Sequence, residues 1–459
     1  VDSAVTALIM RERGYKVVGM NLRLFSPGDP EHSVNPCCGI PAMDDARATC
    51  ALIGMPFYAV NMEVEFGEAV VNRFVDEYAA GRTPKNQESL YTEEATMSKT
   101  TEFYPTKYWQ ILDDGRVQCD VCPRLCKLHE GQQGLCFVRG RHGDRIMLTS
   151  YGRSSGFCID PIEKKPLNHF LPGTSVLSFG TAGCNLACKF CQNWDMSKSR
   201  EMDTLADEAS PLKLAQVAHE LGCRSMAYTY NDPVIFMEYA MDVAIACQEY
   251  GIKSVAVTAG YMCDEPRREF FKYMDAANVD LKAFNEEFYW KICGGHLQPV
   301  LDTLIYLKRE TQVWFEITTL LIPGENDSDL ELEALTQWVV ENLGPDVPIH
   351  FTAFHPDWKM LNHSPTPPST LIRARRIAMK NGVRYAYTGN IHDEKGGSTY
   401  CHYCGQQLIG RDWYTLGVWN LTADGRCNSC GAACAGVFEA KPGTWGARRR
   451  PVRLRQYAD

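Results

Sequence analysis

The chain has 459 residues, 45% of them hydrophobic and 22% charged, which leaves room for roughly two to four domains and excludes a wholly disordered protein. Its 47 basic and 56 acidic residues give a net charge of −9, which argues against a broad nucleic-acid surface. We see no apolar run of about 18 residues and no signal-like segment, so we expect a soluble, cytoplasmic protein without a membrane partner. The chain has 20 cysteines, and in a chain this long the ones that cluster indicate metal or iron–sulfur ligands rather than a disulfide scaffold.

The first segment, residues 1–85, has the pattern of an α/β fragment. A helix is predicted over 3–13 and a strand over 15–24, followed by another helix, strand and helix. No strand precedes the first helix, so we expect a truncated unit. The polar, aperiodic stretch that comes next contains Pro84 and Asn86, and it predicts a linker, which we place at 86–117.

From residue 175 onward, within a core that we place at 118–398, short β-branched or apolar runs alternate with segments of helical length. This alternation predicts a parallel α/β sheet, open or curled into a barrel, with its ligand site at the carboxyl ends of the strands. The predicted strands are 176–181, 225–230, 254–258, 279–283, 313–321 and 349–354, and the predicted helices are 212–221, 234–250, 267–276, 300–309, 330–342 and 370–380.

Three closely spaced cysteines, Cys184, Cys188 and Cys191, follow the first of these strands. Three thiolates on one loop can bind three irons of a [4Fe–4S] cluster and leave the fourth iron without a protein ligand. A structural zinc loop is the alternative, but it would need a fourth ligand nearby. The position of the loop after a strand favours the cluster.

This spacing in an α/β chain resembles the signature of the radical S-adenosylmethionine (SAM) superfamily. The resemblance implies a partial (β/α) barrel in which SAM chelates the open iron and is cleaved by one electron to methionine and a 5′-deoxyadenosyl radical. Other segments resemble the pyruvate formate-lyase activase branch, and they make Asn231 and Asp232 candidates for binding the SAM amino group, although that branch has Glu where Asp232 stands. Three further candidate SAM-binding residues at strand ends are Thr258, Asp280 and Lys282.

Motifs from 118 to 436 resemble one family in particular, the radical SAM enzyme of the AmmeMemoRadiSam system. They include the cysteines of segment 119–136, the run His350-Phe-Thr-Ala-Phe354, the run Tyr387-Thr-Gly-Asn390 and a terminal module with paired cysteines. The family is named for its genomic association with Memo-like and AMMECR1-domain proteins, which are therefore candidate partners. The resemblance does not supply a substrate.

The cysteines of segment 119–136 are four in number, enough to close a zinc or an iron–sulfur site. Pro123 and Gly134 mark turns that bring such ligands together. The spacing does not choose between the metals, and we favour a structural metal over a second, redox-active cluster. These ligands are Cys119, Cys122, Cys126 and Cys136.

A zinc ribbon is predicted over 399–436, because two Cys-x2-Cys pairs are each followed by glycine. Four thiolates complete a tetrahedron, so Cys434 should be a spare thiol. Residues 437–459 are rich in arginine, and we expect them to be a solvated basic tail. The zinc ligands are Cys401, Cys404, Cys427 and Cys430.

Residues 1–85 also resemble the start of a tRNA-specific 2-thiouridylase. The segments that carry this resemblance include Cys37-Cys38 and Gly81-Arg-Thr-Pro84. That family opens with a Ser-Gly-Gly-Val-Asp-Ser loop that binds pyrophosphate, whereas this chain begins at Val1. Lys85-Asn-Gln87 stands where the family has its nucleophilic cysteine. We therefore expect a truncated, nucleotide-binding-like fragment that does not activate ATP.

Two classes of function follow. In the first, residues 118–398 form a radical SAM core that uses a [4Fe–4S] cluster, SAM and an electron donor of flavodoxin or ferredoxin type to abstract hydrogen from an unidentified substrate, beside a zinc-binding ribbon. A glycyl-radical-enzyme activase is the alternative within this class. In the second, the ribbon, the basic tail and the thiouridylase-like fragment bind tRNA, which the acidic net charge disfavours. No catalytic residue is assigned beyond the cluster ligands.

Overall fold

The computed structural model describes residues 17, 19–23, 50, 55–61, 103–198 and 207–457. The chain divides into two compact units, Val1–Lys99 and Thr100–Asp459. In the first unit, β1 (Gly19–Arg23) and β2 (Phe57–Asn61) pair in parallel. The strand predicted over 15–24 is thereby confirmed in β1, while the helix predicted over 3–13 lies outside the described residues.

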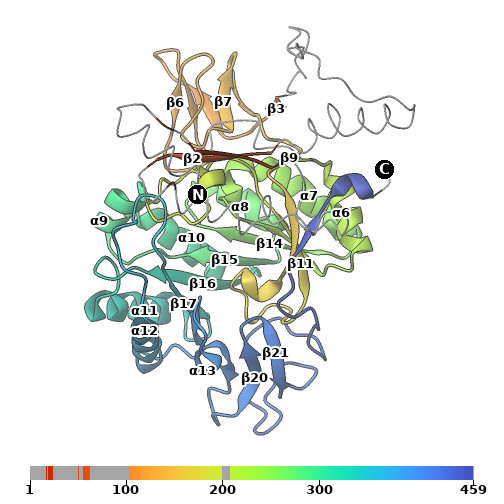
Figure 1. Ribbon diagram of the computed structural model, residues 1–459, viewed down its shortest axis with the longest axis vertical. Helices are drawn as coiled ribbons and strands as arrows, with labels where there is room; N and C mark the ends of the chain where they lie inside the picture. Colours follow the sequence, from red (N-terminus) through yellow and green to blue (C-terminus); the bar gives the residue numbers. More distant parts are fainter. Residues whose placement is uncertain are drawn as a thin grey trace. The chain divides into compact units, whose positions relative to one another are not determined.

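The second unit is built on a nine-stranded sheet in the order β18-β17-β16-β15-β14-β13-β11-β10-β22 (Figure 1). The strands from β11 to β18 in this order are parallel to one another. The order has two ends, so the predicted parallel sheet is open. Its parallel strands are β11 (Ser175–Phe179), β13 (Ser225–Tyr228), β14 (Lys253–Thr258), β15 (Ala276–Asp280), β16 (Trp314–Leu321), β17 (Ile349–Ala353) and β18 (Ala386–Gly389).

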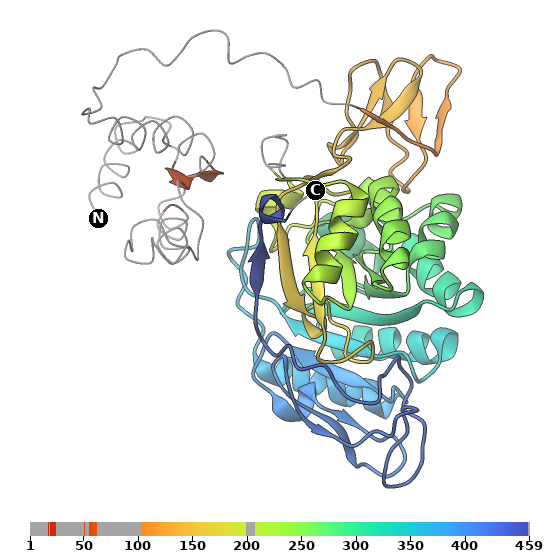
Figure 2. The same cartoon turned by 90° about the vertical axis from the view of Figure 1, so that its right-hand side faces the viewer.

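Helices connect these strands and cover one face of the sheet (Figure 2). Ser210 and Ser328 cap two of them by accepting hydrogen bonds from the backbone N–H groups of Lys213 and Glu331. The helix predicted over 267–276 begins earlier, because Pro266 fits the first turn, where its missing N–H costs nothing. The helices are α6 (Pro211–Glu220), α7 (Met237–Glu249) after a 3-10 turn η6 (Pro233–Phe236), α8 (Asp264–Phe270) followed by η7 (Phe271–Tyr273), α10 (Gln298–Glu310), α11 (Asp329–Leu343) and α12 (Pro368–Lys380).

The other face of the sheet is filled at the amino-terminal halves of its strands. Apolar side chains of β11, β13, β14 and β15 pack there against Ile162, Leu167 and Phe170 of the segment that follows β10. Glu316 of β16 holds the same segment by accepting hydrogen bonds from the N–H groups of Asn168 and His169, at 3.0 and 2.7 Å. The carboxyl ends of the strands are therefore left as the place for a ligand.

The linker predicted over 86–117 is wrong in its second half, where short strands form. These strands are only two or three residues long, so their sequences show no periodicity, and aromatic contacts such as the stacked rings of Tyr104 and Tyr151 hold them in place. Two three-stranded sheets result, β3-β8-β7 and β4-β5-β6. Their strands are β3 (Tyr104–Pro105), β4 (Trp109–Ile111), β5 (Val117–Cys119), β6 (Lys127–Leu128), β7 (Arg139–His142) and β8 (Arg145–Leu148).

The predicted ribbon is a three-stranded sheet of β19 (Thr399–Tyr400), β20 (Gln407–Asp412) and β21 (Thr415–Trp419). The prediction of a solvated tail over 437–459 is wrong, because β22 (Arg450–Val452) pairs with β10 (Phe157–Pro161) and the buried Val452 and Leu454 anchor it. The remaining short elements are β9 (Arg153–Ser154), η4 (Ile162–Lys164), α5 (Trp194–Ser197), β12 (Asp207–Glu208), α9 (Glu286–Phe288), the π-helical turn η8 (Tyr289–Cys293), α13 (Glu394–Gly397) and η9 (Leu454–Gln456).

Among the described helices, none is both long and apolar enough to cross a membrane.

Candidate iron–sulfur and metal sites

The three-cysteine loop leaves the carboxyl end of β11, as the sequence predicts. The backbone N–H groups of Leu186 and Asn193 donate hydrogen bonds to the sulfur atoms of Cys184 and Cys191. Each donor lies two residues after its cysteine, so the loop turns its amide dipoles toward the sulfurs. Burial raises the pKa of both thiols, and these hydrogen bonds oppose that rise.

Two features of the structure require glycine at position 183, in the three-cysteine loop. Its φ of +83° is in the left-handed region, and a β-carbon there would lie 1.9 Å from the carbonyl oxygen of Cys136. We expect Gly183→Ala to displace the cluster loop and to lower the iron content of the reconstituted protein by about four per chain. Gly143→Ala is the control, because Gly143 also has a positive φ but no atom within 4 Å of the added carbon. Equal iron in both variants would contradict this role of Gly183.

Asn231 holds this loop from the neighbouring strand. Its side-chain oxygen accepts a hydrogen bond from the N–H of Thr181 at 3.1 Å, and its amide nitrogen donates to the carbonyl oxygen of Gly183 at 2.9 Å. The side chain is buried. The prediction that Asn231 binds SAM is not tested by these contacts, which give it a part in positioning the loop.

Asp232 is likewise buried and bonded within the protein. One carboxylate oxygen accepts from the Oγ1 of Thr258 at 2.8 Å and from the N–H of Val234 at 3.1 Å. The other accepts from the N–H of Ala259 at 2.9 Å. Burial raises the pKa of Asp232, and these three hydrogen bonds oppose the shift. The geometry therefore makes Asp232 a cap of η6 and a tie between β13 and β14.

The opposite side of the loop is cationic. A hydrogen bond with Cys293, aided by Lys282, lowers the pKa of Cys188. Burial lowers the pKa of Lys282, but the Asp280 carboxylate, 2.7 Å from its Nζ, together with Cys188 and Cys293 raises it overall. Cys293, which lies outside every cysteine motif of the sequence, thus belongs to this site, and no local motif could have shown it.

Thr318 of β16 is a further group near the strand ends. Its Oγ1 is buried and has no hydrogen-bond partner among the described residues. In the register of the sheet Thr318 pairs with Asp280 of β15. The carboxyl ends of β14, β15 and β16 therefore offer Thr258, Asp280, Lys282 and Thr318, of which Asp280 is about one-third exposed.

The ribbon brings its four predicted ligands together. All four sulfur atoms lie within 4.8 Å of one another, and two pairs lie 3.6 and 3.7 Å apart. Gly405 and Gly431 donate N–H hydrogen bonds to the carbonyls of Cys401 and Cys427 in two matching turns. Four thiolates about 2.3 Å from a zinc ion are about 3.8 Å apart, so the geometry fits a single tetrahedral ion.

The ribbon is attached to the nine-stranded sheet by a buried polar network. His169 contacts the hydroxyl of Tyr387 in β18 at 2.5 Å and the carbonyl oxygen of Ala435 at 2.6 Å. Arg411 of β20 donates to the carbonyl oxygen of Asn168 at 2.6 Å. Cys434 is buried against the ring of His169 and lies outside the four-sulfur group, as a spare thiol should. Burial lowers the pKa of His169 to about 4, so the ring is neutral at pH 7.

These features define a class of protein: an open parallel α/β sheet with a three-cysteine loop at the end of its first parallel strand. The chain belongs to the radical SAM superfamily: residues 179–334 match the sequence model of that family. It is 38% identical over 325 residues to MJ0808, a protein of Methanocaldococcus jannaschii, a match that covers 71% of this chain and 96% of that one.

The amino-terminal residues match a different group. Residues 1–89 match the tRNA methyl transferase HUP domain. Over 84 residues the chain is 43% identical to the tRNA-specific 2-thiouridylase MnmA of Rhizobium rhizogenes, a match covering 18% of this chain. The chain spans about a fifth of the length of that enzyme, 21%. The resemblance to a thiouridylase fragment is thereby confirmed.

Matches to solved structures have low sequence identity and low TM-scores. A domain of a pyruvate-formate lyase-activating enzyme from Bacteroides vulgatus is 16% identical, with a TM-score of 0.33, and the match covers 36% of this chain and 99% of that one. SuiB of Streptococcus suis bound to S-adenosylmethionine is 14% identical, with a TM-score of 0.38, covering 50% and 53% of the two chains.

Proposed function

We propose that the protein uses a [4Fe–4S] cluster held by Cys184, Cys188 and Cys191 to cleave SAM and abstract a hydrogen atom from a substrate. The observation that carries the proposal is the three-cysteine loop at the carboxyl end of β11, with no fourth thiol in its motif. When bound, such a cluster supplies the electron that splits SAM into methionine and a 5′-deoxyadenosyl radical.

The residues around the loop fit this cofactor. Amide N–H groups face two of the sulfurs, and Lys282 and Lys198 place positive charge near the third. The sulfur atoms of the four ribbon ligands all lie within 4.8 Å of one another. Among the described residues, Cys184, Cys188 and Cys191 do not form such a group. A polynuclear cluster is wider than a single ion, so this wider spacing suits it.

We assign Asn231 and Asp232 to positioning rather than to direct contact with SAM. Asp232→Ala leaves three donors without their acceptor, two of them backbone N–H groups, and should lower the free energy of unfolding by about 1–3 kcal/mol. Asp232→Glu should also destabilise, because a longer side chain must fit the same buried space. Urea unfolding of the reconstituted proteins measures both. A SAM affinity about tenfold weaker in Asp232→Ala at unchanged stability would instead show direct binding.

A direct test uses the reduced protein. Electron paramagnetic resonance of the anaerobically reconstituted and reduced chain should show a cluster signal that changes when SAM is added, because SAM would bind the iron without a protein ligand. SAM labelled in its carboxylate with 17O should broaden that signal. A signal unaffected by either form of SAM would contradict the proposal.

Within this class we place the chain in the AmmeMemoRadiSam type, on the motifs between residues 118 and 436. Memo-like and AMMECR1-domain proteins are then its candidate partners, and a flavodoxin- or ferredoxin-type protein its electron donor. A glycyl-radical-enzyme activase is the alternative. A stable glycyl radical formed on an added partner protein would favour the activase. A binary complex with a Memo-like protein would favour the AmmeMemoRadiSam type.

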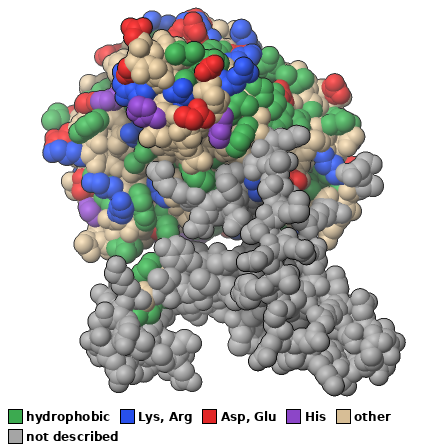
Figure 3. Space-filling view, turned by 90° about the horizontal axis from the view of Figure 1, so that it is seen from above, with side chains coloured by type: hydrophobic (Ala, Val, Ile, Leu, Met, Phe, Trp, Pro, Cys, Tyr) green, Lys and Arg blue, Asp and Glu red, His purple; other side chains and the backbone are tan. Residues whose placement is uncertain are grey.

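A tRNA-binding function is the weaker candidate. Basic, acidic and hydrophobic side chains are interspersed on the described part of the face in Figure 3. The Arg-rich end of the chain is partly used in the fold, since Arg449 donates to the sulfur of Cys158 at 3.3 Å and β22 pairs with β10. Salt-dependent retention of tRNA by the full chain would revive this function.

A further inference from the structure

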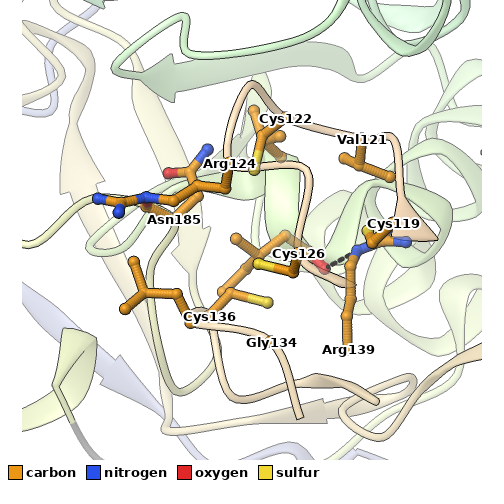
Figure 4. Close-up of a pocket in the computed structure, with 12 residues that line it drawn as sticks. Cys119, Val121, Cys122, Arg124, Cys126, Gly134, Cys136, Arg139 and Asn185 are labelled. Carbon is orange, nitrogen blue, oxygen red and sulfur yellow. Dashed lines mark hydrogen bonds between the residues drawn. The ribbon is translucent and has the colours of Figure 1, made fainter. Parts of the chain in front are cut away.

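A second set of four cysteines encloses a pocket in the second unit. Cys119 ends β5, Cys122 and Cys126 lie in the turn to β6, and Cys136 precedes β7. Figure 4 shows the sulfur atoms of Cys122, Cys126 and Cys136 directed into the space between these loops. The pocket that the four cysteines line has room for at least one water molecule.

The spacing of these sulfurs differs from that of the ribbon. In the ribbon, the two closest sulfur pairs, 3.6 and 3.7 Å apart, match a tetrahedron around one zinc ion. In the second set, no three sulfurs of the described cysteines lie within 4.8 Å of one another. A polynuclear centre holds its thiolates farther apart than a single ion does, so the more open arrangement suits such a centre.

The pocket is arranged for negative charge. The N–H groups of Val121 and Arg124 donate hydrogen bonds to the sulfurs of Cys119 and Cys122. Arg139 is 2% exposed and lines the pocket; its Nε donates to the carbonyl oxygen of Ile235 at 2.8 Å, and Nη2 pairs with Glu238. Its remaining nitrogen, Nη1, is buried without a hydrogen-bond partner in the described residues. A buried guanidinium N–H without a partner can donate to a further acceptor, and metal-bound thiolates and sulfides are acceptors of this kind.

We propose that Cys119, Cys122, Cys126 and Cys136 hold a second [4Fe–4S] cluster. Four protein thiolates close such a cluster, so it has no open iron for SAM and differs in role from the first. It lies against the SAM-cluster loop: the carbonyl oxygen of Cys136 packs on Gly183, and Arg124 donates to the carbonyl oxygen of Asn185 at 2.9 Å. The proposal departs from the structural metal that the sequence alone favours, and it stands whether or not the protein cleaves SAM.

The test is a metal analysis of the Cys184→Ala, Cys188→Ala, Cys191→Ala triple variant, reconstituted anaerobically with iron and sulfide. We expect it to keep about four irons and about four sulfides per chain, beside about one zinc in the ribbon. Its reduced form should give a paramagnetic resonance signal that SAM does not change. A triple variant with about two zinc and no iron would overturn the proposal, and this outcome would leave SAM cleavage by the wild type unaffected.

Variants of the second set provide an independent measurement. Cys122→Ser and Cys126→Ser in the otherwise unchanged chain should each lower the iron content from about eight to about four per chain. Cys247→Ala is the matched control, because Cys247 is fully buried in α7 and lies in neither set. Unchanged iron in both serine variants would overturn the proposal. If they fail to fold, the triple variant alone decides.

Discussion

The Cys184→Ala, Cys188→Ala, Cys191→Ala triple variant should lose reductive cleavage of SAM completely. These thiolates are the only protein ligands proposed for the cluster that binds SAM, so their loss removes the electron source at the place where SAM is held. The fold should persist, because most of the core that the sheet and its helices share, including Leu177, Val279 and Ile317, lies outside this loop. Liquid chromatography of quenched reactions measures 5′-deoxyadenosine directly.

The control for this experiment is again Cys247→Ala, which removes a buried thiol from a helix. It should cleave SAM at the wild-type rate after correction for any loss of folded protein. Cleavage of SAM by the triple variant would mean that another site in the chain holds the active cluster.

Loss of the ribbon metal is the second large expected effect. Cys401→Ser should release about one zinc per chain, because a tetrahedral site with three thiolates binds the ion far more weakly. The free energy of unfolding should fall by several kcal/mol, on the order of the loss of a structural metal. The effect should spread to the edge of the sheet at β18, since Thr399 and Arg411 bond to Tyr387 and Asn168. Zinc analysis and thermal unfolding measure both effects.

Cys434→Ala is the matched control for the ribbon. Cys434 is buried beside the same site but is outside the four-sulfur group, so its loss should leave the zinc content unchanged. Iron bound at Cys184, Cys188 and Cys191 should be retained in Cys401→Ser. If Cys401→Ser kept its zinc, the assignment of these ligands would fail.

Local sequence predicts much of this fold. The parallel strands from β11 to β17 and the helices between them were predicted near their observed bounds, because apolar runs and helical stretches alternate at regular spacing. Spacing alone also predicts the four zinc ligands, because each Cys-x2-Cys turn places two sulfurs together without help from the rest of the chain.

What could not be predicted depends on contacts between distant residues. β22 joins β10 across about 290 residues of sequence, and the charges around it suggested only a solvated tail. The sequence predicts the strand end at which Asp232 lies. It does not predict the hydrogen bonds of Asp232, because the donors Thr258 and Ala259 lie at the end of another strand, β14. Sequence spacing does not identify the metal at Cys119 to Cys136 for the same reason: the fold sets the distances between the sulfurs.

The central claim, that this chain cleaves SAM through the three-cysteine loop, is tested most directly by one measurement. The wild-type protein, reconstituted with iron and sulfide and reduced without oxygen, is incubated with SAM, and 5′-deoxyadenosine and methionine are quantified. The account predicts that both products form in equal amounts and only when reductant is present. A protein that carries its full iron and sulfide, binds SAM and yet forms neither product would contradict the account.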